Sequence, residues 1–180
     1  MAELIPVATV EDILPQYRNT PVERLLRYHN LREPQPPTTI RAEILIGTCI
    51  DHREELIVPN EFAYVIRTAG SNLRNHEFQI SYVIAAAGVT TLALLSHTDC
   101  GMSHVTQKRE AFISGLVERG GCTLEEAIQQ FEEYAPIYEI GDPVAFVLTE
   151  TVRIRRLYPK ILVTPLLYRV EDDKLAQILE

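Results

Sequence analysis

Residues 42–49 read AEILIGTC, a short apolar run that ends on a cysteine and is typical of a buried β-strand. Two later runs, at residues 62–67 (FAYVIR) and 89–96 (VTTLALLS), have the same character. Residues 73–87 have helical character and lie between these two runs, and Gly88 follows them as a C-cap. Strands that alternate with helices predict an α/β fold, with a mainly parallel β-sheet flanked by helices.

The chain continues this alternation towards its end. Three more helices are predicted, over residues 105–120, 123–134 and 143–157. The second starts with the Thr-x-x-Glu pattern of a capping box at Thr123, and Asp142 can cap the third. A last strand is predicted over residues 161–170, either continuous or broken into two at Pro165.

Residues 1–39 differ from the rest and are predicted to form an N-terminal helical arm. Within them, residues 21–33 (PVERLLRYHNLRE) place a proline at the first helical turn and repeat apolar side chains on one face. The proline-rich residues 33–39 (EPQPPTT) predict a stiff extended connector to an α/β domain, residues 40–180. The apolar face of the helix has to be covered by the chain's own core or by another subunit, and we expect it to pack in a dimer.

The charge balance of the 180-residue chain argues against two classes of partner. Acidic side chains number 25 and basic ones 17, which gives a formal charge of −8. Surfaces that bind nucleic acid or anionic membranes need clustered Lys and Arg, so we expect neither partner. The most apolar stretch, residues 82–95, is shorter than the ~20 residues that cross a bilayer.

Cysteine usage and the first residues predict a cytoplasmic protein. Residues 1–12 (MAELIPVATVED) lack the basic region and the continuous apolar region of a secretory signal. Three cysteines, an odd number, do not make a disulfide framework, so we expect reduced thiols. The positions of the cysteines are therefore informative about chemistry.

Metal-ligand side chains lie at the ends of two predicted strands. Cys49-Ile-Asp-His-Arg53 comes at the end of the first strand, and His97-Thr-Asp-Cys100 comes at the end of the third. Because sites form at the carboxyl ends of neighbouring parallel strands, we expect Cys49, His97 and Cys100 to converge. Each motif alone has a plain explanation, as a core cysteine or a chance spacing, but the two together favour a metal site.

The donor set indicates which metal this is. Two thiolates and one imidazole select zinc over magnesium, calcium or manganese. Three protein ligands leave the fourth tetrahedral position open, which is the layout of a catalytic zinc site. The competing interpretation is a binding or interaction module in which zinc only holds the fold together.

Asp51 and Arg53 are two residues apart and can pair through a bidentate, charge-assisted hydrogen bond. If Arg53 holds the carboxylate, zinc is free to carry a water whose pKa falls from 15.7 to roughly 7. If the carboxylate of Asp51 moves onto the metal, the site is closed. The alternative is an ordinary surface ion pair, which contributes little.

Three motifs in order along the chain resemble the β-class carbonic anhydrases. The family signature is Cys-x-Asp-x-Arg, then Arg-x-Ala-Gly, then His-x-x-Cys-Gly. This chain has Cys49-Ile-Asp-His-Arg, Arg67-Thr-Ala-Gly and His97-Thr-Asp-Cys-Gly. The resemblance covers about residues 40–180 and identifies the chain as a divergent member. The helix at residues 21–33 is similar to the N-terminal helix of the family, which packs across a dimer.

The resemblance implies a cofactor, an activity and an assembly. Zinc would be bound by Cys49, His97 and Cys100 in a homodimer or a larger homo-oligomer. The implied reaction is the reversible hydration of carbon dioxide to bicarbonate and a proton. It would proceed by zinc-hydroxide attack on carbon, with the Asp51–Arg53 dyad orienting the nucleophile.

Departures from the family pattern leave alternatives open. His52, Thr68 and Ser96 stand where the family usually has Ser, Asn and Gly, and none of them removes a ligand or a dyad residue. Relatives on the same scaffold hydrolyse carbon disulfide or carbonyl sulfide, so a hydrolase of such a CO2 analogue is one alternative. A non-catalytic zinc-binding protein is the other. Gly101, whose backbone N–H can face a substrate oxygen, is the substrate-binding candidate.

Overall fold

The computed structural model describes residues 2–35 and 41–179 of the chain, and within them a six-stranded mixed β-sheet forms the centre of the molecule. The spatial order of the strands is β1-β6-β5-β4-β2-β3. Parallel pairing joins β2 to β3, β2 to β4 and β4 to β5, whereas β6 pairs antiparallel with β5 and with β1. The prediction of a mainly parallel sheet is thus confirmed. The strands are β1 (Glu3–Pro6), β2 (Ile44–Cys49), β3 (Ala63–Thr68), β4 (Thr91–His97), β5 (Leu162–Arg169) and β6 (Lys174–Leu179).

Five α-helices accompany the sheet in the described part of the chain, and their ends carry the predicted signals. Gly88 has the left-handed backbone of a C-cap, with φ 71°. Thr123 and Glu126 form the predicted capping box, and the Asp142 carboxylate accepts a hydrogen bond of 2.7 Å from the Ala145 N–H. The helices are α1 (Pro21–His29), α2 (Glu77–Ala87), α3 (Arg109–Gly120), α4 (Leu124–Tyr138) and α5 (Pro143–Leu157); the short 3-10 helices are η1 (Val10–Asp12), η2 (Pro15–Tyr17), η3 (Ala69–Ser71) and η4 (Gly101–Lys108).

Several boundaries differ from the sequence-based expectation. Helix α1 ends at His29 and not at residue 33, α2 begins at Glu77 and not at residue 73, and α4 runs on to Tyr138 and not to residue 134. The predicted helix over residues 105–120 is divided into η4 and α3, with a non-helical backbone at His104 (φ −141°) inside η4. The last parallel strand, β5, runs unbroken through Pro165. Pro165 pairs with β4, and the pairing of β5 with β6 begins only at Leu166, so the missing N–H of the proline affects one ladder at most.

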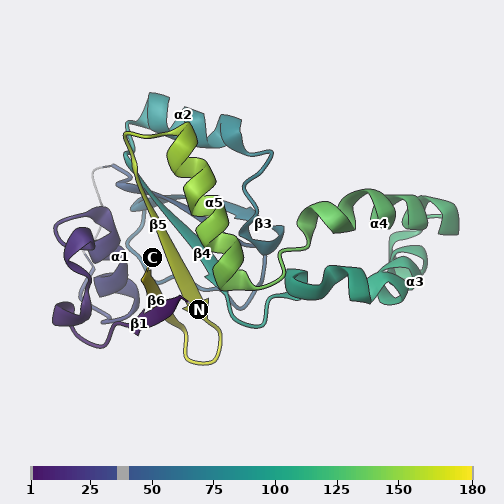
Figure 1. The fold of residues 1–180 in the computed structure, drawn as a ribbon, viewed down its shortest axis with the longest axis horizontal. Helices are drawn as coiled ribbons and strands as arrows, with labels where there is room; N and C mark the ends of the chain where they lie inside the picture. The colour runs from purple at the N-terminus through teal and green to yellow at the C-terminus, as the bar shows by residue number, and fades with distance from the viewer. Residues whose placement is uncertain (1, 36–40, 180) are drawn as a thin grey trace.

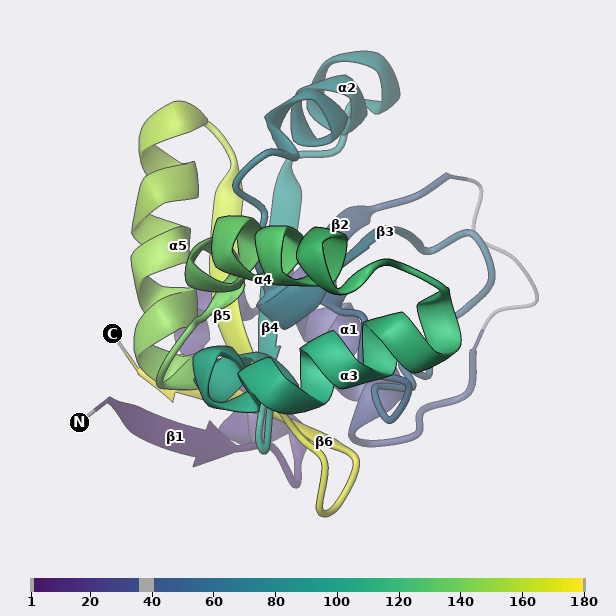
Figure 2. The ribbon, with the colours of Figure 1, turned by 90° about the vertical axis from the view of Figure 1, so that its right-hand side faces the viewer.

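Alternate side chains of each strand point to opposite sides of the sheet, so both faces carry side chains to be buried. Helices cover both faces. Helix α1 packs on one face, where its apolar side chains join those of β2, β4 and β5 in one buried cluster. Helices α2 and α5 cover the other face through a second cluster (Figure 1). Helices α3 and α4 lie side by side as a hairpin (Figure 2) with a small core of its own, and they stand away from the sheet (Figure 1).

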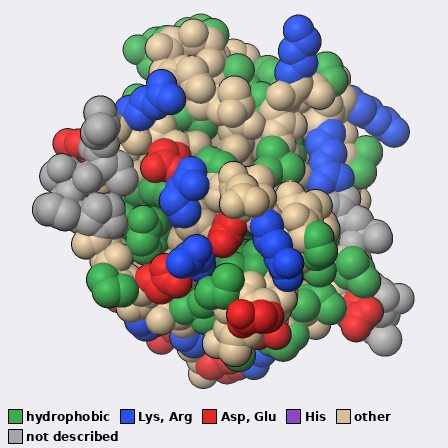
Figure 3. Space-filling view, turned by 90° about the vertical axis from the view of Figure 1, so that its left-hand side faces the viewer, with side chains coloured by type: hydrophobic (Ala, Val, Ile, Leu, Met, Phe, Trp, Pro, Cys, Tyr) green, Lys and Arg blue, Asp and Glu red, His purple; other side chains and the backbone are tan. Residues whose placement is uncertain are grey.

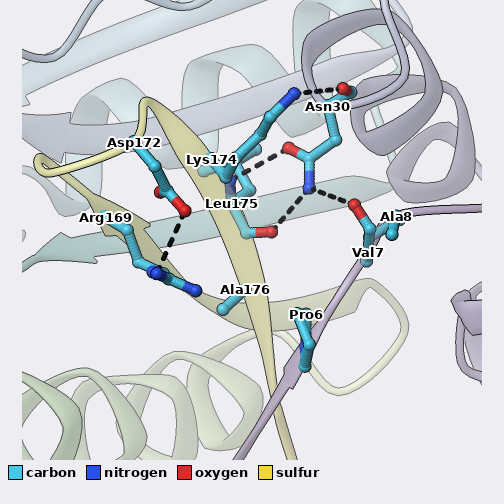
Figure 4. A pocket seen from close by; sticks show the side chains of 9 residues that line it. All are labelled: Pro6, Val7, Ala8, Asn30, Arg169, Asp172, Lys174, Leu175 and Ala176. Carbon is cyan, nitrogen blue, oxygen red and sulfur yellow. Dashed lines mark hydrogen bonds and ion pairs between the residues drawn. The ribbon is translucent and has the colours of Figure 1, made fainter.

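The N-terminal arm is built into this chain's own fold. Strand β1 pairs with β6 at one edge of the sheet, which the sequence did not predict. The Asn30 side chain joins the segments: its Nδ2 donates to the carbonyls of Val7 and Leu175, and its Oδ1 accepts from the Leu175 N–H (Figure 4). The apolar stripe of α1 is fully buried against the sheet. The stripe from which we expected a dimer contact is therefore already used within the chain.

The junction between the arm and the α/β domain falls at residues 39 and 40, which lie outside the described residues, as does most of the proline-rich connector. On the face that carries α1, basic and acidic side chains are interspersed (Figure 3), and Arg27 pairs there with both Glu23 and Glu33. Among the described residues, no helix combines the length and apolar character needed to cross a membrane.

Candidate metal centre

The three predicted metal ligands meet at the carboxyl-terminal edge of the sheet. Cys49 is the last residue of β2 and His97 the last of β4, and because these neighbouring strands are parallel, both residues lie at the same edge of the sheet. Cys100 follows from the turn after β4 and precedes η4. The ligand atoms of all three buried side chains lie within 4.8 Å of one another. The predicted convergence is confirmed.

The ring of His97 is oriented as a metal ligand. Its Nδ1 lies 2.9 Å from the carbonyl oxygen of Thr98, so Nδ1 carries the proton and donates it to that oxygen. Its Nε2 is buried and has no hydrogen-bond partner. A buried acceptor without a donor is costly unless a cation satisfies it, so this nitrogen fits a metal ion.

Gly70, the end of the Arg-x-Ala-Gly motif, supports the first sulfur ligand. Its backbone N–H donates to the Sγ of Cys49 at 3.3 Å. Gly70 has φ 64°, and a Cβ at this position would lie 2.7 Å from Cγ2 of Ile140. The motif thus needs glycine, both for its backbone conformation and for space, in order to bring an N–H onto the sulfur.

The two thiols interact directly. Cys100 donates a hydrogen bond that lowers the pKa of the Cys49 thiol to about 4, and the same bond raises the pKa of Cys100. The thiolate is the form of cysteine that binds metals. The contact between the two sulfurs therefore favours an ionised Cys49, in the form that can bind a metal ion.

Asp51 and Arg53 form the bidentate pair that the spacing predicts. Arg53 Nε donates to Asp51 Oδ1 at 3.0 Å and Nη2 donates to Oδ2 at 2.8 Å, while the backbone N–H of Arg53 adds a third bond to Oδ1. The guanidinium holds the pKa of the Asp51 carboxyl well below its usual range. Oδ2 of Asp51 lies 4.0 Å from Nε2 of His97, so an ionised carboxylate stands beside the ligand nitrogen.

Asp99 is a contact of this pair that the sequence reasoning missed. Arg53 Nη1 donates to its Oδ2 at 2.8 Å, and Nη2 donates to its backbone carbonyl at 3.0 Å. Asp99 adopts φ 54°, an uncommon backbone conformation that Asp tolerates better than most residues. Its position between His97 and Cys100 is the signal that could have found it.

Glu54 is the second residue that was missed. Its side chain is fully buried, and burial raises the pKa of its carboxyl to about 8. The Thr48 hydroxyl donates to its Oε2, but its Oε1 has no hydrogen-bond partner and lies 3.7 Å from Nε2 of His97. Arg67 fastens the surrounding loop, because its guanidinium donates to the carbonyls of both Cys49 and Glu54.

Gly101, the predicted substrate-binding residue, opens η4 directly after Cys100. Its carbonyl accepts a hydrogen bond of 3.2 Å from Nζ of Lys108. The role of its N–H towards a substrate oxygen stays a prediction.

Comparison with known proteins identifies which solved structures share this fold. The sequence matches no family model and no curated protein. Solved structures do match, and the class they define is the β-carbonic anhydrases. Isoform I from Trichomonas vaginalis is 19% identical, with a TM-score of 0.65 over 85% of this chain and 92% of that one. A carbonic anhydrase from Glaciozyma antarctica is 18% identical, with a TM-score of 0.62 over 93% and 96%.

A carbon disulfide hydrolase in its apo form is also similar, at 20% identity and a TM-score of 0.55 over 90% of each chain. Identities this low establish the fold and leave the activity to be argued from the site. The chain therefore has the β-carbonic anhydrase fold in a divergent version.

Proposed function

We propose that this protein is a zinc-dependent carbonic anhydrase, which converts carbon dioxide and water reversibly into bicarbonate and a proton. The observation that carries the proposal is the buried group of Cys49, His97 and Cys100, set beside an Asp51 that Arg53 holds. The names of the similar structures support the same activity.

Zinc fits the three donors. Two sulfurs and one imidazole nitrogen with a free lone pair make the set that zinc prefers, and no further protein atom is needed to complete a catalytic layout. The ion, when bound, supplies a Lewis acid that makes water nucleophilic at neutral pH. The chain contributes the rest: the buried side chains of Cys49, His97 and Cys100 would hold the ion, and the Thr98 carbonyl fixes the imidazole tautomer.

Asp51 and Arg53 would orient the nucleophile. With both carboxylate oxygens facing the guanidinium, Asp51 is kept ionised, and Oδ2 remains an acceptor for the proton of a water beside His97. A water that donates to Oδ2 keeps a lone pair directed at the substrate carbon. Gly101 is proposed to meet a substrate oxygen through its backbone N–H.

A second candidate reaction is the hydrolysis of carbon disulfide or carbonyl sulfide, because the similarity to a carbon disulfide hydrolase is comparable in identity and coverage. Stopped-flow hydration of carbon dioxide by the zinc-loaded protein tests the main proposal, with the two sulfur compounds assayed in parallel. Turnover of a sulfur compound alone would favour the second candidate. Zinc-loaded protein that turns over none of the three would support a non-catalytic zinc-binding role.

We also propose a homo-oligomer in the cytoplasm, with a small molecule as substrate. Among the described residues, strand β3 lies at an open edge of the sheet, where the exposed fractions of Tyr64 and Val65 are 42% and 49%. Apolar open edges of this kind usually pair with another strand or are blocked, so a second copy of the chain is the proposed cover. The free thiols of all three cysteines support a reducing compartment.

A further inference from the structure

Glu54 has a place in the metal centre that neither the motifs nor the dyad explains. We propose that Glu54 supplies the fourth protein donor to the ion held by Cys49, His97 and Cys100, in the place usually expected for Asp51. The inference rests on the metal site proposed above and concerns which residue closes that site at rest.

Two buried acceptors face each other without a donor between them. Nε2 of His97 has no hydrogen-bond partner, and neither has Oε1 of Glu54, and the two atoms are 3.7 Å apart. The side chains are 1% and 0% exposed, so bulk water does not reach them. A cation between them satisfies both.

The separation is close to that of two ligands on one tetrahedral ion. Zinc–nitrogen and zinc–oxygen bonds of 2.0–2.2 Å at a tetrahedral angle put the two ligand atoms about 3.4 Å apart. Oε1 of Glu54 is not a member of the compact group of three, so it has to close on the sulfurs by rotating its side chain. The Thr48 hydroxyl holds the other carboxylate oxygen.

Asp51 is the less available of the two carboxylates. It receives three hydrogen bonds from Arg53, and its Oδ2 is 4.0 Å from Nε2 of His97. To bind the ion it has to give up a bidentate, charge-assisted pair. Glu54 gives up nothing at Oε1. Its backbone is meanwhile fastened beside Cys49 by Arg67.

The consequence is a centre whose fourth position is occupied at rest by a buried residue outside the dyad. Water and substrate enter that position only when the Glu54 carboxylate turns away, while Asp51 stays on Arg53. The dyad then has an orienting task alone, and access to the ion is controlled by Glu54.

A structure of the zinc-loaded full chain is the direct test. We expect Oε1 of Glu54 at about 2.0–2.2 Å from zinc and Asp51 still paired with Arg53. Water or Asp51 in the fourth position, with Glu54 turned away, would overturn the proposal. A chain that holds no zinc at Cys49 and His97 would instead refute the proposed function, so the two failures are distinguishable.

Cobalt affinity, measured by competition with a chelator, gives a readout independent of activity. We expect Glu54→Gln to weaken cobalt binding by about tenfold or more and to change the visible spectrum of the bound ion. The matched control is Glu55→Gln, an exposed carboxylate one residue away, which should leave both unchanged. Asp51→Asn should alter the affinity less than Glu54→Gln, and the reverse order would contradict the proposal. Circular dichroism of each variant confirms that the comparison is between folded proteins.

Discussion

Arg53 contacts two carboxylates at once, and these contacts decide what Asp51 is free to do. Its fork faces Asp51, and the outer Nη1 is anchored on the Asp99 side chain. Hydrogen bonds of this charge-assisted, bidentate kind are the stronger ones in proteins, and this pair is shielded because the Asp51 side chain is only 15% exposed. The guanidinium therefore supplies two of the three hydrogen bonds from Arg53 that hold Asp51 beside His97.

Without that guanidinium, the Asp51 carboxylate should bind the zinc ion and block its open position. We expect Arg53→Ala to keep its zinc but lose about 100-fold or more in carbon dioxide hydration, because Asp51 is then free to bind the ion. Arg53→Lys should recover little, since a lysine has no planar two-donor fork. Stopped-flow rates and zinc content measure the two properties. Arg169→Ala, which removes a surface arginine paired with Glu171 and Asp172, is the control. Parental rates in Arg53→Ala would reduce the dyad to a structural ion pair.

Spacing along the chain predicted the ligands of this site but not the residues around them. Cys49, His97 and Cys100 could be placed because the carboxyl ends of parallel strands meet at one edge. Glu54 could not, because it stands in a Glu-Glu pair whose other member is exposed. Glu54 is buried against Thr48, which donates a hydrogen bond to it, and against His97, which lies more than forty residues away in sequence.

At the level of the elements, helix α1 was predictable in its position and not in its packing. The proline at its start and the apolar stripe mark the helix in sequence. Its cover is formed by strands that come later in the chain, and β1 pairs with β6 across almost the whole sequence, as Leu4 opposite Ile178 shows. Local pattern carries no information about pairings of that range. Strands β1 and β6 are also short, with four and six residues.

His29, the last residue of α1, gives a test of this packing through pH. Burial lowers the pKa of His29 to about 4, against about 6.5 in an unfolded chain. Between these values the unfolded chain binds a proton that the folded chain does not, so stability falls as the pH is lowered through this window. The loss due to His29 from pH 7 to pH 5 is about 2 kcal/mol.

Urea unfolding of the parent and of His29→Gln at both pH values isolates this contribution. We expect the parent to lose about 2 kcal/mol more than His29→Gln between pH 7 and pH 5. The exposed His52 is the matched control, and His52→Gln should follow the parent. Equal losses in the parent and in His29→Gln would mean that His29, and with it the end of α1, is accessible to water.

For the whole molecule, the open edge of the sheet is the surface that bears on assembly. Strand β3 has β2 on one side and no strand on the other in the described structure. Since α1 has its apolar stripe buried within the chain, β3 replaces it as the expected contact between subunits. Natural sheets block such edges with charged residues, and this edge presents Tyr64 and Val65.

A charge placed on that edge should separate the subunits. We expect Val65→Lys to shift the mass measured by light scattering from at least two copies to the 20.4 kDa of one chain. Val65 is half-exposed, so the substitution leaves the core intact. Gln130→Lys, on the exposed side of α4, adds the same charge elsewhere and should not change the mass. A parent protein that is already a monomer at micromolar concentration would contradict the expected assembly.

Cys49, His97 and Cys100 are proposed to hold a zinc ion that hydrates carbon dioxide, and one paired measurement tests this role most directly. Zinc content and stopped-flow carbon dioxide hydration are determined on the parent and on Cys100→Ser, prepared side by side. We expect one zinc per chain and clear hydration activity in the parent, with both lost together in Cys100→Ser. Hydration that persists in Cys100→Ser, or a full equivalent of zinc in that variant, would contradict this role.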